Sequence, residues 1–125
     1  MDKEYQEFEN EFLSKLETTS IGLAIINNSG SLCYENFKNI DDKNDILTIA
    51  TEAITRISQV VKKLDTKYPE FLILRGTKAF LILTSSLYKE HFYVIFGANS
   101  QSMGMTKICL QNTINTFEKR YSRVL

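Results

Sequence analysis

Few side chains in this sequence have the type and spacing that catalysis or metal binding requires. It contains one histidine, His91, and two cysteines, Cys33 and Cys109, which lie far apart and outside any CxxC pair. A zinc site would need the histidine, both cysteines and a carboxylate to converge, and a Ser–His relay would need an acid beside the imidazole. We therefore interpret His91 as an ordinary residue of an edge strand and the cysteines as reduced core thiols.

The segment GANSQSMGMTKICL, residues 97–110, could be taken for a phosphate-binding loop. A P-loop has the pattern GxxxxGK[ST] and a dinucleotide loop GxGxxG, whereas Gly97 and Gly104 are seven residues apart. We interpret the segment as a strand-to-helix connection in which Gly97 ends the strand and Asn99 or Ser100 caps the helix. Gly104 costs about 1 kcal/mol relative to alanine in a helix, and we expect it to let this helix approach the sheet closely.

The remaining composition excludes several classes of function. The 125 residues include 15 Lys and Arg and 15 Asp and Glu, so the formal net charge is zero and does not attract nucleic acid. The carboxylates of Asp41 and Asp42 lie in a polar linker, where we expect them to be solvated. The acidic N-terminus is unlike a secretory signal, and no apolar run nears the roughly 20 residues of a membrane helix. We expect one cytoplasmic domain, residues 1–125, without catalytic residues, metal, cofactor or membrane insertion.

Hydrophobic periodicity predicts three helices and five strands. Apolar residues in segments 3–18, 46–64 and 102–123 recur at three- and four-residue steps, which is typical of amphipathic helices. IGLAII and SLCYENF are two strands joined by a turn at Asn27–Gly30. FLIL, AFLILT and FYVIF form a three-strand meander, and their nearly continuous apolar character indicates that both faces of the sheet are covered. We predict an α/β (α+β) fold, a three-layer α/β/α sandwich around a five-stranded antiparallel sheet, in the order helix, strand, strand, helix, strand, strand, strand, helix.

The middle helix has an unusually wide apolar face. At about 100° per residue its apolar positions cover an arc of roughly 160°, whereas docking on one surface requires roughly 100°. The helix could be sunk deeper into its own domain, or it could contact the sheet on one side and a second copy of itself on the other. The rest of its circumference is polar, which favours the second explanation.

These elements resemble the roadblock / dynein light chain 7 domain family. The closing block SMGMTKICLQNTINTF, residues 102–117, is similar to the family's last helix, which opens with a small–hydrophobic–Gly–small segment. The resemblance extends back through the meander to the hairpin IGLAIINNSGSLCYE, and covers about residues 21–117. It implies a profilin-like roadblock fold and a dimer, with middle helices side by side and third strands paired edge to edge. Family members are non-enzymatic platforms, including dynein subunits, a lysosomal scaffold for Rag GTPases and MglB-like regulators of Ras-like GTPases.

We therefore expect a dimeric adaptor or scaffold that is not an enzyme. Its partners would be itself, as a homodimer, or a roadblock paralogue, together with a small Ras-like GTPase. The residues expected at the dimer interface are Leu47, Ile49, Ile54, Ile57 and Val61 of the middle helix and Phe71 and Ile73 of the pairing strand. Two alternatives stay open: a small-molecule sensor domain, and a profilin-like actin-binding protein, although the sequence has no Trp for a proline-peptide platform.

Overall fold

The structure is a computed structural model that describes residues 2–16, 21–27, 29–37, 43–66, 71–77, 79–85, 91–98 and 102–121. Its elements follow the predicted order, and each lies within a few residues of its expected bounds. They are α1 (Asp2–Leu16), β1 (Ile21–Asn27), β2 (Leu32–Asn36), α2 (Lys43–Leu64), β3 (Phe71–Arg75), β4 (Ala79–Ser85), β5 (His91–Ala98) and α3 (Met103–Tyr121). None of the described helices is long and apolar enough to span a membrane. The predicted Asp41–Asp42 pair lies outside the described residues.

All five strands form one antiparallel sheet in the order β2-β1-β5-β4-β3. The β1–β2 hairpin and the β3–β4–β5 meander are joined because β1 pairs with β5, from Ile21 opposite Gly97 to Asn27 opposite His91. This pairing places β5 at the centre of the sheet and leaves β2 and β3 at its two edges. The prediction that His91 lies on an edge strand is therefore wrong, because the last strand of the meander is inserted against β1.

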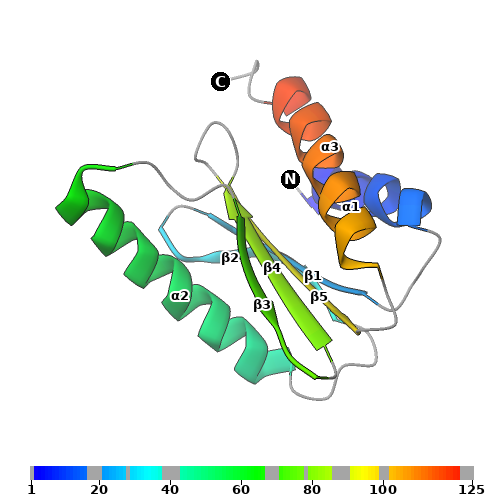
Figure 1. Cartoon of the computed structure of the whole chain (residues 1–125). Helices are drawn as coiled ribbons and strands as arrows, with labels where there is room; N and C mark the ends of the chain where they lie inside the picture. The colour runs from blue at the N-terminus through cyan, green and yellow to red at the C-terminus, as the bar shows by residue number, and fades with distance from the viewer. Residues whose placement is uncertain are drawn as a thin grey trace.

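Helices cover both faces of the sheet, which confirms the predicted three layers (Figure 1). One face packs against α1 and α3 and the other against α2. Alternate residues of β1 divide between the two layers: Leu23 and Ile25 belong to the α1/α3 core, and Ala24 and Ile26 to the α2 core. Because side chains of a strand point alternately to opposite faces, burial on both sides requires the continuous apolar runs seen in the sequence.

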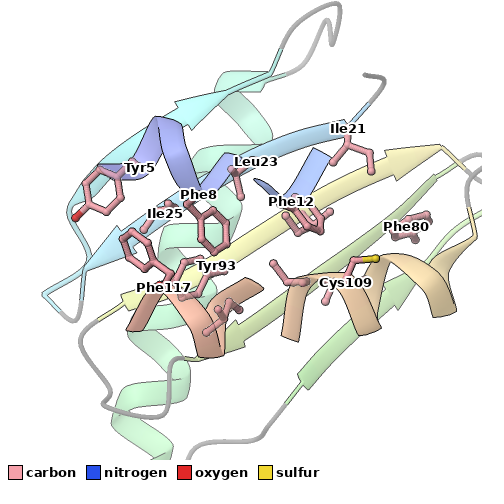
Figure 2. Packing of buried hydrophobic residues seen from close by; sticks show 14 residues of the cluster. Tyr5, Phe8, Phe12, Ile21, Leu23, Ile25, Phe80, Tyr93, Cys109 and Phe117 are labelled. Atoms are coloured by element: carbon pink, nitrogen blue, oxygen red, sulfur yellow. The ribbon is translucent and has the colours of Figure 1, made fainter. Parts of the chain in front are cut away.

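The α1/α3 layer contains most of the large aromatic side chains (Figure 2). Phe8 of α1 stacks on Tyr93 of β5 with ring centroids 5.1 Å apart, and meets Phe117 of α3 edge to face at 5.3 Å. Phe12 is fully buried beside them. Such ring pairs contribute about 0.5–1.5 kcal/mol beyond the area they bury, so this layer is expected to dominate the stability of the fold.

The turn between β1 and β2 is fixed by one side chain. Asn27 Oδ1 accepts hydrogen bonds from the backbone N–H of Ser29 at 3.0 Å and of Ser31 at 2.9 Å. Gly30 has φ of 89°, a left-handed conformation that L-residues with a Cβ rarely adopt. These contacts confirm the predicted hairpin and place Gly30 next to the middle of α2.

The connection from β5 to α3 differs from the prediction in two ways. The backbone N–H of Met105 bonds Ser102 Oγ at 3.2 Å, so Ser102 caps the helix, while Asn99 and Ser100 lie outside the described residues. Gly104 faces open space, with nothing within 4 Å of where a Cβ would stand. The residue that permits close packing is Gly97, whose Cβ would lie 2.6 Å from Phe80 Cζ.

Candidate interaction surface

The middle helix α2 is covered on only part of its apolar face. Ala50 and Ile54 are its fully buried residues and pack against Phe92 and Val94 of β5. In contrast, three large apolar side chains of α2 are exposed: Ile49 by 60% and Val60 by 53%, both on one flank of the helix, and Leu64 by 68% at its C-terminal end. The apolar arc of roughly 160° therefore has a buried part and an uncovered part. The structure thus does not support the first alternative, in which the helix is sunk deeper into its own domain.

The polar flank of α2 faces the β1–β2 turn. A Cβ on Gly30 would lie 3.6 Å from Thr55 Oγ1, and Lys43 Nζ is 3.2 Å from Glu35 Oε1 of β2. An open groove of about 530 Å³ runs between the helix and this turn. It is lined by Ser29, Gly30, Thr51, Glu52, Thr55, Arg56 and Gln59.

The apolar flank of α2 consequently points toward the opposite edge of the sheet, where β3 lies. Successive residues of an α-helix are about 100° apart, so Ile49 and Val60 project away from the Thr55 side. Leu72 and Leu74 of β3 lie on the same face of the sheet as α2, because they pair with Leu83 and Leu81, which pack in the α2 core. Their exposed fractions are 36% and 56%. We call this set the α2–β3 surface: Ile49, Val60, Leu64, Leu72 and Leu74.

Strand β3 is an edge strand, since it pairs only with β4 among the described strands. One side of an edge strand presents backbone N–H and C=O groups that can pair with another strand. Natural proteins usually protect such an edge with charged residues, whereas the residues at 71–74 of β3 are FLIL. The α2–β3 surface therefore combines exposed apolar side chains with an open sheet edge.

The five α2 residues predicted for the dimer interface differ in their exposure. Ile49 lies on the exposed surface, and Leu47, Ile57 and Val61 of the same helix are half-buried. Ile54 is only 1% exposed and packs between α2 and the sheet, so its direct contact with a partner is not possible while the helix stays docked.

The two residues predicted on β3 have different outcomes. Ile73 packs against the α1/α3 core on the other face of the sheet, and the side chain of Phe71 lies outside what the structure describes. The residues that face α2 from this strand are Leu72 and Leu74, which sequence reasoning missed. Alternate side chains of the strand FLILR point to opposite faces of the sheet, so either the odd-numbered or the even-numbered residues could face α2. Only the pairing with β4 decides between these two sets.

The single histidine belongs to a buried polar cluster on the far face of the sheet. His91 Nε2 lies 3.0 Å from Tyr5 Oη, and its Nδ1 lies 3.4 Å from Glu118 Oε1. The hydroxyl of Tyr93 donates to the same carboxylate oxygen at 2.7 Å. These contacts connect α1, β5 and α3 within the aromatic layer, whereas the polar groove lies at α2 on the opposite face. We interpret the cluster as structural.

Among the described residues, no three His, Cys, Asp or Glu side chains are grouped closely enough to hold a metal ion. Cys109 is buried in the α1/α3 core and Cys33 is half-buried on β2, and both are free thiols. Among the described residues, two candidates for interaction therefore remain: the α2–β3 surface, and the polar groove on the other flank of α2.

The arrangement of this sheet and its three helices matches known structures. MglB of Myxococcus xanthus superposes with a TM-score of 0.78 at 12% sequence identity, over 98% of this chain and 91% of that one. A Roadblock/LC7 domain from Streptomyces avermitilis superposes with a TM-score of 0.67 at 7% identity, over 91% and 93% of the two chains. The chain has the roadblock fold.

The fold of this chain is also similar to that of a profilin. LokiProfilin1, solved in complex with rabbit actin, superposes with a TM-score of 0.53 at 15% identity, over 100% of this chain and 98% of that one. No protein-family model and no curated protein matches the sequence. Identities this low establish the fold, and function has to be argued from the surfaces that this chain presents.

Proposed function

We propose that this chain is a cytoplasmic, non-enzymatic adaptor or regulator that dimerises and binds a small Ras-like GTPase or holds a larger complex together. The observation that carries the proposal is the α2–β3 surface, where three large apolar side chains of α2 and two of the edge strand β3 are exposed. Contiguous exposed apolar residues beside polar ones mark interaction sites in soluble proteins.

The α2–β3 surface has the features expected of a dimer interface. Burying the exposed part of each large side chain contributes about 1 kcal/mol, and a two-fold interface counts every residue twice. Edge-to-edge pairing of β3 would add backbone hydrogen bonds and continue the sheet into the second subunit. The two α2 helices would then lie next to each other, as the family resemblance implies.

The polar face of α2 stays open in such a dimer, and we propose it as the contact for the GTPase. The groove beside the β1–β2 turn is lined by hydroxyl, amide and charged side chains, including Glu52 and Arg56. Regulation would follow if this surface binds one nucleotide state of the GTPase more tightly than the other. A difference of about 1–3 kcal/mol in binding free energy is sufficient for such coupling.

The alternative functions have less support from the described surfaces. A small-molecule sensor requires a concave, largely apolar pocket with a few converging polar groups. The groove at α2 is instead open to solvent and lined by polar residues and one glycine. An actin-binding function is supported only by the profilin-like superposition, whose TM-score of 0.53 is below the 0.78 with MglB.

Light scattering on the purified protein tests both parts of the proposal. Alone, the protein is expected to scatter as twice its chain mass of 14.4 kDa. Mixed with Ras-like GTPases loaded with GDP or a GTP analogue, it is expected to form a larger complex with one nucleotide form. A monomer that binds neither form of any GTPase tested would contradict the proposal.

A further inference from the structure

We infer that the polar groove between α2 and the β1–β2 turn binds an extended polypeptide segment of the partner, with a basic and an acidic side chain two positions apart. The inference rests on the proposed function, in which this groove contacts a protein, and it names the chemistry of the segment that enters the groove. Two rows of side chains on α2 carry it: Thr51 with Thr55, and Glu52 with Arg56.

The hydroxyl groups that line the groove are arranged to accept hydrogen bonds from a ligand. A hydroxyl has one proton to donate and two lone pairs that accept. Thr51 Oγ1 donates its proton to the carbonyl of Thr48 at 2.9 Å, and Thr55 Oγ1 donates to the carbonyl of Thr51 at 3.0 Å. Ser29 Oγ of the turn donates to Asn27 Oδ1 at 2.7 Å. A ligand therefore has to supply N–H groups to these oxygens, which a peptide backbone does at every residue except proline.

The spacing of the two threonines fits the backbone of an extended chain. Thr51 and Thr55 are four residues apart on α2, so they lie about 6 Å apart along the helix axis. Alternate residues of an extended strand present N–H groups on the same edge, about 6.7 Å apart. Gly30 of the turn has no side chain, and even a Cβ there would lie 3.6 Å from Thr55 Oγ1. Two N–H groups of one segment can therefore donate to both threonines.

The second row on α2 selects the side chains of the segment. Glu52 and Arg56 each follow one of the threonines, so they lie about 100° farther around the helix and are again about 6 Å apart along its axis. In an extended chain, side chains stand out of the plane of the N–H groups, and residues i and i+2 share one face. A segment whose N–H edge meets the threonines thus presents one face to Glu52 and Arg56. A basic residue fits opposite Glu52, and an acidic residue fits opposite Arg56.

Both charged side chains are accessible to such a segment. Glu52 and Arg56 are exposed, and neither takes part in an ion pair observed within the described part of the chain. The groove continues past Arg56 to Gln59 and to Lys62, whose side chains can donate hydrogen bonds to carbonyl or carboxylate oxygens. Acceptors thus line the end of the groove near Thr51, and donors line the end near Lys62. A segment with a basic residue at one end and an acidic residue at the other complements this order.

Two capped seven-residue peptides of equal composition test the inference. Gly-Thr-Lys-Val-Asp-Thr-Gly has its charges two positions apart, whereas Gly-Thr-Lys-Asp-Val-Thr-Gly has them on adjacent residues, which point to opposite faces of an extended chain. NMR titration of the isotope-labelled protein measures both dissociation constants and shows which amide signals shift. We expect the first peptide to bind about fivefold more tightly than the second, with the largest shifts at residues of the groove.

Substitutions in the groove test the two rows separately. Thr55→Val removes one acceptor and keeps the shape of the side chain, so it should weaken binding of the first peptide about fivefold. Thr116→Val on α3 is the matched control and should leave binding unchanged, because Thr116 is also exposed and donates to the carbonyl of Asn112 at 3.1 Å. Glu52→Lys should weaken binding of the first peptide and strengthen binding of a third peptide in which Asp replaces its Lys.

Melting curves followed by circular dichroism check that each variant is folded. The inference is wrong if neither peptide shifts the signals of the groove, if both bind equally, or if Thr55→Val and Thr116→Val have the same effect. If the protein binds a GTPase but neither peptide, the inference fails and the proposed function stands. If the first peptide binds as expected and no GTPase does, the inference stands and the proposed GTPase contact fails.

Discussion

The two faces of the sheet differ in how completely the chain covers them. Two helices, α1 and α3, pack on one face and enclose a core in which 14 of the described apolar residues are buried, many of them aromatic. The single helix α2 covers the other face, where eight of the described apolar residues are buried and large apolar side chains of α2 and β3 stay exposed. The chain thus covers one face of its sheet more completely than the other.

The largest effect on stability is expected from a substitution in the core between the sheet and helices α1 and α3. Phe12 of α1 is 0% exposed and packs near Phe8 in the aromatic layer. Truncation of a buried Phe removes its transfer free energy and leaves a cavity, so Phe12→Ala should lower the free energy of unfolding by about 3–5 kcal/mol. Urea denaturation monitored by circular dichroism measures the change. A loss below about 1 kcal/mol would show that this layer is less tightly packed than described.

Two isoleucines of α2 allow a buried position and an exposed position of the same helix to be compared. Ile54→Ala removes a side chain that is 1% exposed and should cost about 2–5 kcal/mol of monomer stability. Ile49→Ala, at 60% exposure on the same helix, should change monomer stability by no more than about 0.5 kcal/mol. Unfolding at protein concentrations below the dissociation constant of the dimer gives the comparison. Equal losses would mean that Ile49 is covered within its own chain.

Alanine substitutions at two glycines near α3 compare a tightly packed position with an open one. A Cβ at Gly97 would lie 2.6 Å from Phe80 Cζ, so Gly97→Ala forces that ring to shift and should cost about 1–3 kcal/mol. Gly104→Ala meets no atom within 4 Å in the first turn of α3 and should raise stability by up to about 1 kcal/mol. Thermal unfolding of the two variants measures both values. Stabilisation by alanine at position 97 would contradict the close approach.

Local patterns were sufficient to predict the elements and layers but not the strand order. The apolar runs FLIL, AFLILT and FYVIF predicted a sheet covered on both faces, and the structure confirms it. The sequence does not show that β5 pairs with β1, since that contact joins residues about 70 apart along the chain. His91 was placed on an edge for this reason, although it lies on the central strand and contacts Tyr5 and Glu118.

The candidate surface was predicted at the level of the helix but not of every residue. The wide apolar arc of α2 includes residues that its own chain leaves uncovered, and Ile49 is one of them. The arc did not show which part faces the sheet: Ile54, predicted at the dimer interface, is 1% exposed and packs in the α2 core. The roles of Leu72 and Leu74 depend on the pairing of β3 with β4, because a shift of one residue in register moves every side chain to the other face.

Sedimentation velocity of the wild type and Ile49→Asp tests most directly whether the uncovered face meets a second copy. Thr48→Asp is the matched control, because it adds the same charge to the exposed, polar side of the same helix. We predict that the wild type and Thr48→Asp sediment at twice 14.4 kDa, and that Ile49→Asp sediments as a folded monomer of 14.4 kDa. A wild-type monomer, or an Ile49→Asp variant that stays dimeric, would contradict the account.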